Sequence, residues 1–127
     1  MTSLILVVDD ERDVQNFLSR LRHDNGYEVV TANDGVEALV AVEKHRPSLI
    51  LLDLQMPRDT GTDFYRKMRG HKEFGKIPII VVSALAGRHV AVSKDVPVLN
   101  KPVDEERLLL EVKRALAPES PSGTGAP

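Results

Sequence analysis

The stretch LILVVDD, residues 4–10, joins five consecutive apolar residues directly to two adjacent aspartates. A short run that is apolar on both faces is typical of a strand inside a parallel sheet, because helices cover both faces of such a sheet. The aspartates then stand at the carboxyl end of that strand, where neighbouring negative charges repel each other. Either they start the next helix as capping residues, or they bind something positively charged.

Strand-length apolar runs recur along the chain, with helical patterns between them. The predicted strands are residues 4–8, 27–31, 49–52, 77–82 and 96–99. Apolar residues at helical spacing mark four helices: Val14, Phe17, Leu18 and Leu21; Val36, Leu39 and Val40; Phe64, Tyr65 and Met68; Leu108, Leu109, Val112 and Leu116. This alternation predicts a doubly wound α/β domain with a five-stranded parallel sheet. Residues 85–95 hold few large apolar residues, so the fourth helix of the domain is expected to be short or irregular.

The composition describes a single soluble domain and argues against several classes of partner. Apolar residues make up 42% of the 127 residues and the net charge is −2, so neither nucleic acid nor an anionic membrane is favoured. The absence of cysteine excludes a disulfide framework and a thiolate metal site. The first apolar run is too short for a membrane span, and we expect a cytoplasmic protein. The domain is expected over residues 1–117, followed by a disordered tail or linker stub at 118–127.

Polar residues end four of the five predicted strands. They are Asp9 and Asp10, Asp53, Ser83, and Asn100 with Lys101. The carboxyl ends of parallel strands share one edge of the sheet, and ligands bind at that edge in open α/β sheets. Three carboxylates there suit Mg²⁺, which would offset their mutual repulsion. One carboxylate can also act as a nucleophile and become an aspartyl phosphate, whose oxygens Lys101 and the Ser83 hydroxyl would neutralise.

Four motifs at these strand ends resemble the phospho-receiver domain of two-component response regulators. They are VVDDE (7–11), LILLDLQMPRDTG (49–61), PIIVVSA (78–84) and VLNKPVDEERL (98–108). The resemblance extends from Leu4 to about Leu116. It implies a flavodoxin-like sheet of strand order 2-1-3-4-5. It also implies that Asp53 is the phosphoacceptor and that a sensor histidine kinase or a phosphotransfer protein supplies the phosphoryl group. Such a domain is a conformational switch that catalyses only its own phosphorylation and dephosphorylation.

The same resemblance implies a metal site. Mg²⁺ is the implied cofactor, with Mn²⁺ as a possible substitute. Its ligands would be Asp10 directly, Asp9 directly or through water, Asp53, and the backbone carbonyl of Gln55. Lys101 would pair with the phosphoryl group, and Ser83 would supply the hydroxyl of the switch position, where threonine is frequent in the family. The downstream partner and the oligomeric state do not follow from the resemblance.

Three features depart from the family pattern. The segment between Ser83 and Lys101 is several residues shorter than usual. Val98 stands in place of the switch aromatic, and Val103 stands where phenylalanine often follows Lys-Pro. We therefore expect the phosphorylation chemistry to be retained and the output surface to be altered. Leu85, two residues beyond Ser83, flanks the path of the attacking water in this family, and its bulk is expected to slow hydrolysis.

Other interpretations of these residues remain to be weighed. A pseudo-receiver would keep the fold as an interaction module without phosphotransfer, although the complete acid, hydroxyl and lysine set argues against it. A hydrolase of the haloacid dehalogenase type also uses a nucleophilic aspartate and Mg²⁺, but Gln55 replaces the second acid of its signature. Asp13 is expected to be a first-turn helix acid, and Gly61 to serve turn geometry. The histidines at positions 23, 45, 71 and 89 match no metal-ligand spacing and are expected at the surface.

Overall fold

The computed structural model describes residues 3–9, 17, 20–24, 26–54, 60–83, 96–100 and 104–117. In these residues five parallel strands form one sheet of order β2-β1-β3-β4-β5. The strands are β1 (Leu4–Val8), β2 (Glu28–Ala32), β3 (Leu49–Asp53), β4 (Ile79–Ser83) and β5 (Val98–Asn100). The predicted doubly wound sheet and its strand order are confirmed. The short or irregular fourth helix was predicted at residues 85–95, which lie outside the described residues.

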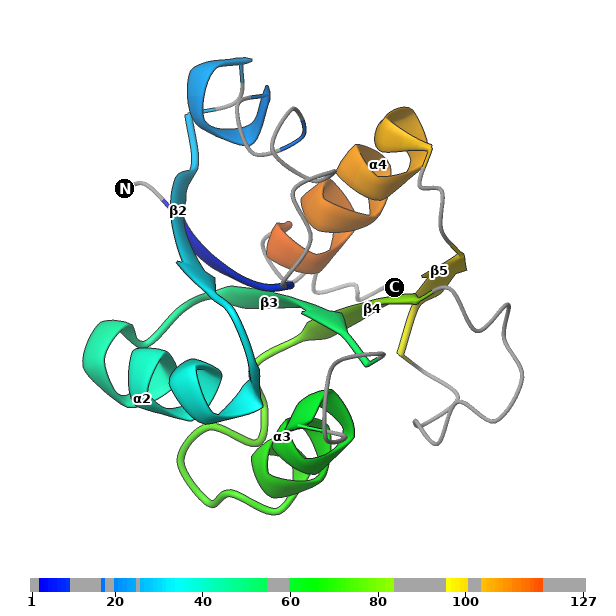
Figure 1. Ribbon diagram of the computed structural model, residues 1–127. Helices are drawn as coiled ribbons and strands as arrows, with labels where there is room; N and C mark the ends of the chain where they lie inside the picture. Colours follow the sequence, from blue (N-terminus) through cyan, green and yellow to red (C-terminus); the bar gives the residue numbers. More distant parts are fainter. Residues whose placement is uncertain are drawn as a thin grey trace, which may run out of the picture.

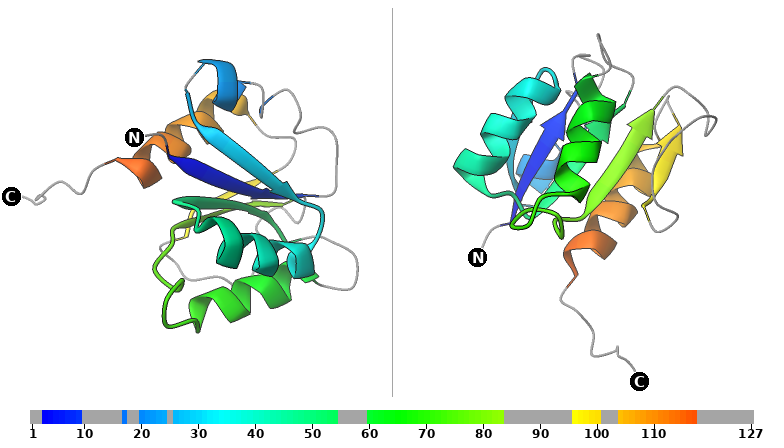
Figure 2. Two further views of the ribbon diagram at one scale, coloured as in Figure 1. Left: turned by 90° about the vertical axis from the view of Figure 1, so that its left-hand side faces the viewer. Right: turned by 90° about the horizontal axis from the view of Figure 1, so that it is seen from below.

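Helices cover both faces of the sheet (Figure 1). They are the π-helix η2 (Arg20–Asp24) and the α-helices α2 (Gly35–His45), α3 (Thr60–Arg69) and α4 (Glu105–Leu116). Helices α2 and α3 lie on one face, while η2 and α4 lie on the other, and the two views of Figure 2 show the same three layers. This arrangement explains why the strands are apolar on both faces.

The core is accordingly split into two clusters by the sheet. Leu6 and Val8 of β1 pack with the residues of α2 and α3, whereas Ile5 and Val7 of the same strand pack with Phe17, Leu21 and α4. The side chains of a strand point to opposite faces in turn, so each strand supplies both clusters. In β3 the alternation ends on a charged residue, Asp53, which is only 3% exposed.

The buried face of α2 differs from the predicted one. Val36 and Val40 were expected to mark its apolar face, but their side chains are 65% and 61% exposed. Ala38 and Val42 are buried instead. The core-facing side of α2 is therefore the one that carries Ala38 and Val42, four residues apart, and Val36 and Val40 lie on the solvent side. Asp34 caps the helix by accepting a hydrogen bond from the backbone N–H of Glu37 at 2.8 Å.

The first predicted helix also differs in its last turn. Residues 20–24 adopt π-helical geometry instead of continuing as an α-helix. The backbone N–H of Tyr27 donates to the Leu21 carbonyl at 3.1 Å, and Gly26 has a φ of 73°, which glycine adopts without strain. The π-helical geometry of this last turn was not foreseen from the sequence.

His71 lies in the connection between α3 and β4 and is half-buried, whereas the sequence placed it at the surface. Its Nδ1 accepts hydrogen bonds from the backbone N–H groups of Glu73 and Phe74, at 3.0 and 3.1 Å. The imidazole ring also packs on the Phe74 ring, with 4.5 Å between their centroids. His71 thus organises the chain that leads into β4.

Candidate functional site

Two of the predicted aspartates lie side by side at the carboxyl edge of the sheet. Val8 of β1 and Leu52 of β3 are register partners in adjacent parallel strands. Asp9 and Asp53 are the next residues along these two strands, and neighbouring strands are about 4.8 Å apart. The backbone N–H of Asp9 donates to the Ala32 carbonyl at 3.1 Å, which extends the pairing with β2 by one residue. The backbone of Asp9 is thereby fixed beside Asp53.

Asp53 is the one buried charged side chain among the described residues, at 3% exposure. Removing a carboxylate from water costs several kcal/mol unless hydrogen bonds or opposite charges compensate it. Asp9, which follows the neighbouring strand at the same edge, is half-exposed. A buried acid beside another acid at a ligand-binding edge is therefore typical of a functional site rather than of a stabilising one.

Gly61 determines how closely α3 approaches Asp53. A Cβ atom at Gly61 would lie 2.4 Å from the backbone carbonyl oxygen of Asp53 and 3.0 Å from the Cα of Leu54. Such distances are too short for any residue with a side chain, so only glycine allows this contact. Gly61 was predicted to serve turn geometry, but the structure places it in the first turn of α3. The pattern of Phe64, Tyr65 and Met68 predicted a helix that did not include Gly61, so this close approach was not foreseen.

The other predicted site residues are described only in part. Ser83 is the last residue of β4, and its register partner is Asn100, the last residue of β5. Both therefore lie at the same edge as Asp53, whose register partner in β4 is Val82. Asp10, Gln55 and Lys101 lie outside the described residues, as do Leu85 and Val103. Within the described residues, which do not include Asp10, no group of three or more His, Cys, Asp or Glu side chains that could hold a metal ion is assembled.

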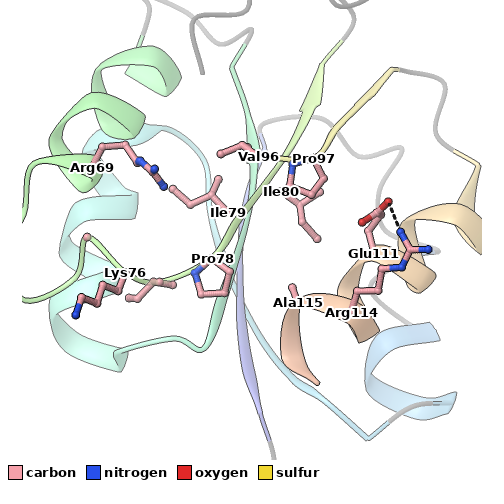
Figure 3. Close-up of a pocket in the computed structure, with 12 residues that line it drawn as sticks. Arg69, Lys76, Pro78, Ile79, Ile80, Val96, Pro97, Glu111, Arg114 and Ala115 are labelled. Atoms are coloured by element: carbon pink, nitrogen blue, oxygen red, sulfur yellow. Dashed lines mark ion pairs between the residues drawn. The ribbon is translucent and has the colours of Figure 1, made fainter. Parts of the chain in front are cut away.

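A cavity of about 520 Å³ lies at the opposite, amino edge of the sheet (Figure 3). Its lining includes Ile79 and Ile80 from the start of β4 and Pro97, which precedes β5. The side chains of Arg69 and Arg114 border it from α3 and α4. Because parallel strands have all their carboxyl ends together, this cavity is separated from Asp53 by the length of the sheet.

Comparison with known proteins identifies the family of this chain. The family model of the response regulator receiver domain matches residues 5–113. The chain belongs to this family. Receiver domains of response regulators are signalling modules. In the part of this receiver domain that the structure describes, no helix is long and apolar enough to cross a membrane.

Two relatives and one solved structure are similar to this receiver domain over most of its length. Protein Rrf1 of Nitratidesulfovibrio vulgaris is 35% identical over 133 residues, which cover 100% of this chain and 96% of Rrf1. Response regulator MprA of Mycobacterium tuberculosis is 37% identical over 95% of the chain, but the chain spans only 54% of MprA. The receiver domain of sensor histidine kinase PA1611 of Pseudomonas aeruginosa superimposes with a TM-score of 0.79, covering 93% of this chain and all of that domain, at 24% identity. That structure holds a magnesium ion in its active-site cleft.

Proposed function

We propose that Asp53 accepts a phosphoryl group from a phosphohistidine of a sensor histidine kinase or a phosphotransfer protein. The reaction depends on Mg²⁺, and the phosphorylated domain, residues 1–117, acts as a conformational switch. The observation that carries this proposal is the 3% exposure of Asp53 at the carboxyl edge, next to Asp9 in the adjacent strand.

The donor set at this edge suits a hard divalent cation. Asp9 and Asp53 offer carboxylate oxygens from adjacent strands, and oxygen is the ligand that Mg²⁺ and Mn²⁺ prefer. Asp10 and the backbone carbonyl of Gln55 would complete the protein ligands. The magnesium ion reported for the PA1611 receiver domain supports the choice of metal. When bound, the ion would neutralise phosphoryl oxygens and relieve the repulsion between the carboxylates.

The transfer itself exchanges one bond to phosphorus for another. A carboxylate oxygen of Asp53 attacks the phosphorus atom as the N–P bond of the phosphohistidine breaks, and the electron pair of that bond leaves with the imidazole. The protein contributes position and electrostatic stabilisation rather than acid–base chemistry. The Lys101 ammonium group neutralises one phosphoryl oxygen, and the Ser83 hydroxyl donates a hydrogen bond to another. These contacts exist only with the phosphoryl group in place, so they can drive the switch.

Intact mass spectrometry tests the proposal directly. Wild-type protein incubated with Mg²⁺ and either acetyl phosphate or phosphoramidate, which contains an N–P bond, should gain the mass of one phosphoryl group. Asp53→Asn should abolish the gain, and removing Mg²⁺ with EDTA should do the same. Asp63→Asn, which changes an exposed carboxylate on α3, should leave it intact and serves as the matched control. If neither donor nor a phosphorylated histidine kinase gives a gain that depends on Asp53, the domain is a pseudo-receiver.

A further inference from the structure

The cavity at the amino edge of the sheet lies where β5 stops short of β4. β4 begins at Ile79, but its pairing with β5 begins only at Val81, the register partner of Val98. The backbone N–H of Val81 donates to the Pro97 carbonyl at 2.9 Å. Proline has no N–H to donate in return, so Pro97 cannot extend the ladder to the Ile79 carbonyl. In the described part of the chain, the start of β4 therefore has no strand partner on this side, and it lines the cavity.

The walls of the cavity are mainly apolar. Ile79, Ile80 and Val96 are buried residues of the core, so this wall is held in place by the packing of the sheet. The other apolar residues of the lining are Ile77, Pro78, Pro97 and Ala115. Sites for small molecules have volumes of roughly 300–1,000 Å³ and are lined mostly by apolar side chains with a few polar groups. The cavity, at about 520 Å³, has both properties.

The charged residues of the lining are mostly cations. Arg69, Lys76 and Arg114 line the cavity together with one carboxylate, that of Glu111. The lining thus carries a net charge of +2, although the whole chain has a net charge of −2. Figure 3 shows that the guanidinium of Arg69 extends toward Ile79, that Arg114 lies on the α4 side, and that Lys76 points outward. Positive charge beside an apolar wall favours a ligand that is both apolar and anionic.

Glu111 neutralises Arg114 only in part. Nη1 of Arg114 lies 3.5 Å from Oε2 of Glu111, which is a long contact between two residues of the same helix. A guanidinium has several N–H donors, so one such contact leaves others for a ligand. The side chain of Arg114 is 68% exposed, whereas that of Glu111 is 16% exposed. The carboxylate of Glu111 therefore belongs to the cavity lining, where it would repel an anion.

We propose that this cavity binds a small amphiphilic organic acid. The apolar body of the ligand packs against Ile79, Ile80 and Val96, and its anionic group lies at Arg114. Arginine suits this role because its planar guanidinium presents paired donors to the oxygens of a carboxylate or a similar oxyanion. An inorganic anion would gain nothing from the apolar walls. The site is independent of Asp53, which lies at the opposite end of the parallel strands.

Anilinonaphthalene sulfonate is the probe for the test, because it combines an aromatic body with an anionic group and fluoresces when it leaves water. Phenylnaphthylamine has the same aromatic body without the charge. Wild-type protein should bind the sulfonate saturably and more tightly than the neutral amine, and added NaCl should weaken binding of the sulfonate alone. Inorganic phosphate should not displace the probe at the same ionic strength.

The nitrogen–proton correlation spectrum of the labelled protein locates the probe. Backbone amide shifts should be concentrated at residues 75–77, 79, 80 and 96 and at the end of α4, which surround the cavity. The same spectrum verifies that the protein stays folded, since this probe also binds partly unfolded states. Shifts centred elsewhere, for example at the exposed Val36 and Val40 of α2, would overturn the inference.

Three variants test the parts of the site. Glu111→Gln removes the repelling carboxylate and should tighten binding of the sulfonate about threefold, whereas Arg114→Met should weaken it by a similar factor. Neither variant should change the affinity for the neutral amine. Ala115→Leu places a larger side chain in the cavity and should weaken binding of both probes.

Two control variants change exposed charges that do not line the cavity. Lys113→Met, next to Arg114 on the same helix, and Glu43→Gln on α2 should keep the wild-type affinity for the sulfonate. Absence of saturable binding, equal affinity for the two probes, or an unchanged affinity in Glu111→Gln or in Ala115→Leu would each overturn the inference. Tighter binding in Glu111→Gln supports it with particular force, because a loss of stability cannot produce a gain of affinity.

Discussion

Polar residues have different roles at the amino and carboxyl edges of the sheet. At the amino edge, His71 accepts two backbone hydrogen bonds. Arg46 forms an ion pair with Glu73, and its Cζ atom lies 5.3 Å from the centroid of the Phe74 ring. Each of these contacts closes the connection between α3 and β4. At the carboxyl edge, the buried Asp53 lies next to Asp9 of the adjacent strand, on the side of the sheet where ligands bind in open α/β folds.

The difference indicates which of these residues serve folding and which serve the proposed function. Polar groups that serve folding have structural partners, because an unpaired buried group costs 1–3 kcal/mol, on the order of a tenth of a domain's stability or more. A buried carboxylate at the edge of the sheet where ligands bind is instead what the proposed phosphoryl and metal site requires. Substitutions in the two groups should therefore affect different observables: stability in the connection between α3 and β4, and Mg²⁺ binding or phosphorylation at the carboxyl edge.

Gly61→Ala should have the largest effect, because it acts on both observables at once. The added Cβ would lie 2.4 Å from the Asp53 carbonyl oxygen, a backbone atom that cannot move without displacing β3 or α3. We expect a loss of about 3 kcal/mol in the free energy of unfolding, measured in urea, and a slower phosphorylation. Gly70→Ala is the matched control, since the nearest atom to its Cβ is 3.8 Å away. Equal losses in the two variants would mean that the contact with Asp53 is not what requires glycine.

Mg²⁺ should stabilise the carboxyl edge through Asp53. A ligand that binds only the folded state raises the free energy of unfolding by about 2.7 kcal/mol when its concentration is one hundred times its Kd. Mg²⁺ should therefore raise the Tm of the wild-type protein. Asp53→Asn should reduce this increase sharply, while Asp63→Asn, on the exposed face of α3, should retain it. Thermal unfolding with and without Mg²⁺ measures the effect. An undiminished increase in Asp53→Asn would place the metal away from Asp53.

His71→Ala should affect stability alone. It removes the acceptor of two backbone N–H groups and the ring that packs on Phe74, at a cost of about 1–2 kcal/mol. The phosphorylation rate should stay at the wild-type value, because His71 lies at the amino edge. His45→Ala, at an exposed histidine of α2, should change the unfolding free energy by less than about 0.5 kcal/mol. A slower phosphorylation in His71→Ala would show that the two edges are coupled.

The sequence predicted the sheet because its signals are local. Fully apolar runs of strand length and the helical patterns between them are sufficient for a parallel sheet, and the position of Asp9 and Asp53 at one edge then follows from topology alone. The predicted rotation of α2 was wrong because hydrophobicity pointed to Val36, whereas the weakly hydrophobic Ala38 is the buried residue. The ion pair between the side chains of Arg20 and Glu105 was not predictable from the sequence, since nothing near either residue identifies a partner 85 residues away.

Asp34 and Asp9 give the finest test of the comparison, because both are aspartates that follow strands at the same carboxyl edge. Asp34 has the structural role that helix-starting acids usually have, since its side chain caps α2 at the Glu37 N–H. Asp34→Ala should therefore cost about 1 kcal/mol of stability and leave the Mg²⁺ affinity unchanged. Asp9→Asn keeps the size of the side chain and should instead weaken Mg²⁺ binding with little effect on the metal-free stability. If calorimetry shows that Asp34→Ala weakens Mg²⁺ binding as much as Asp9→Asn, then Asp9 has no special place in the metal site and the edge acts through its total charge.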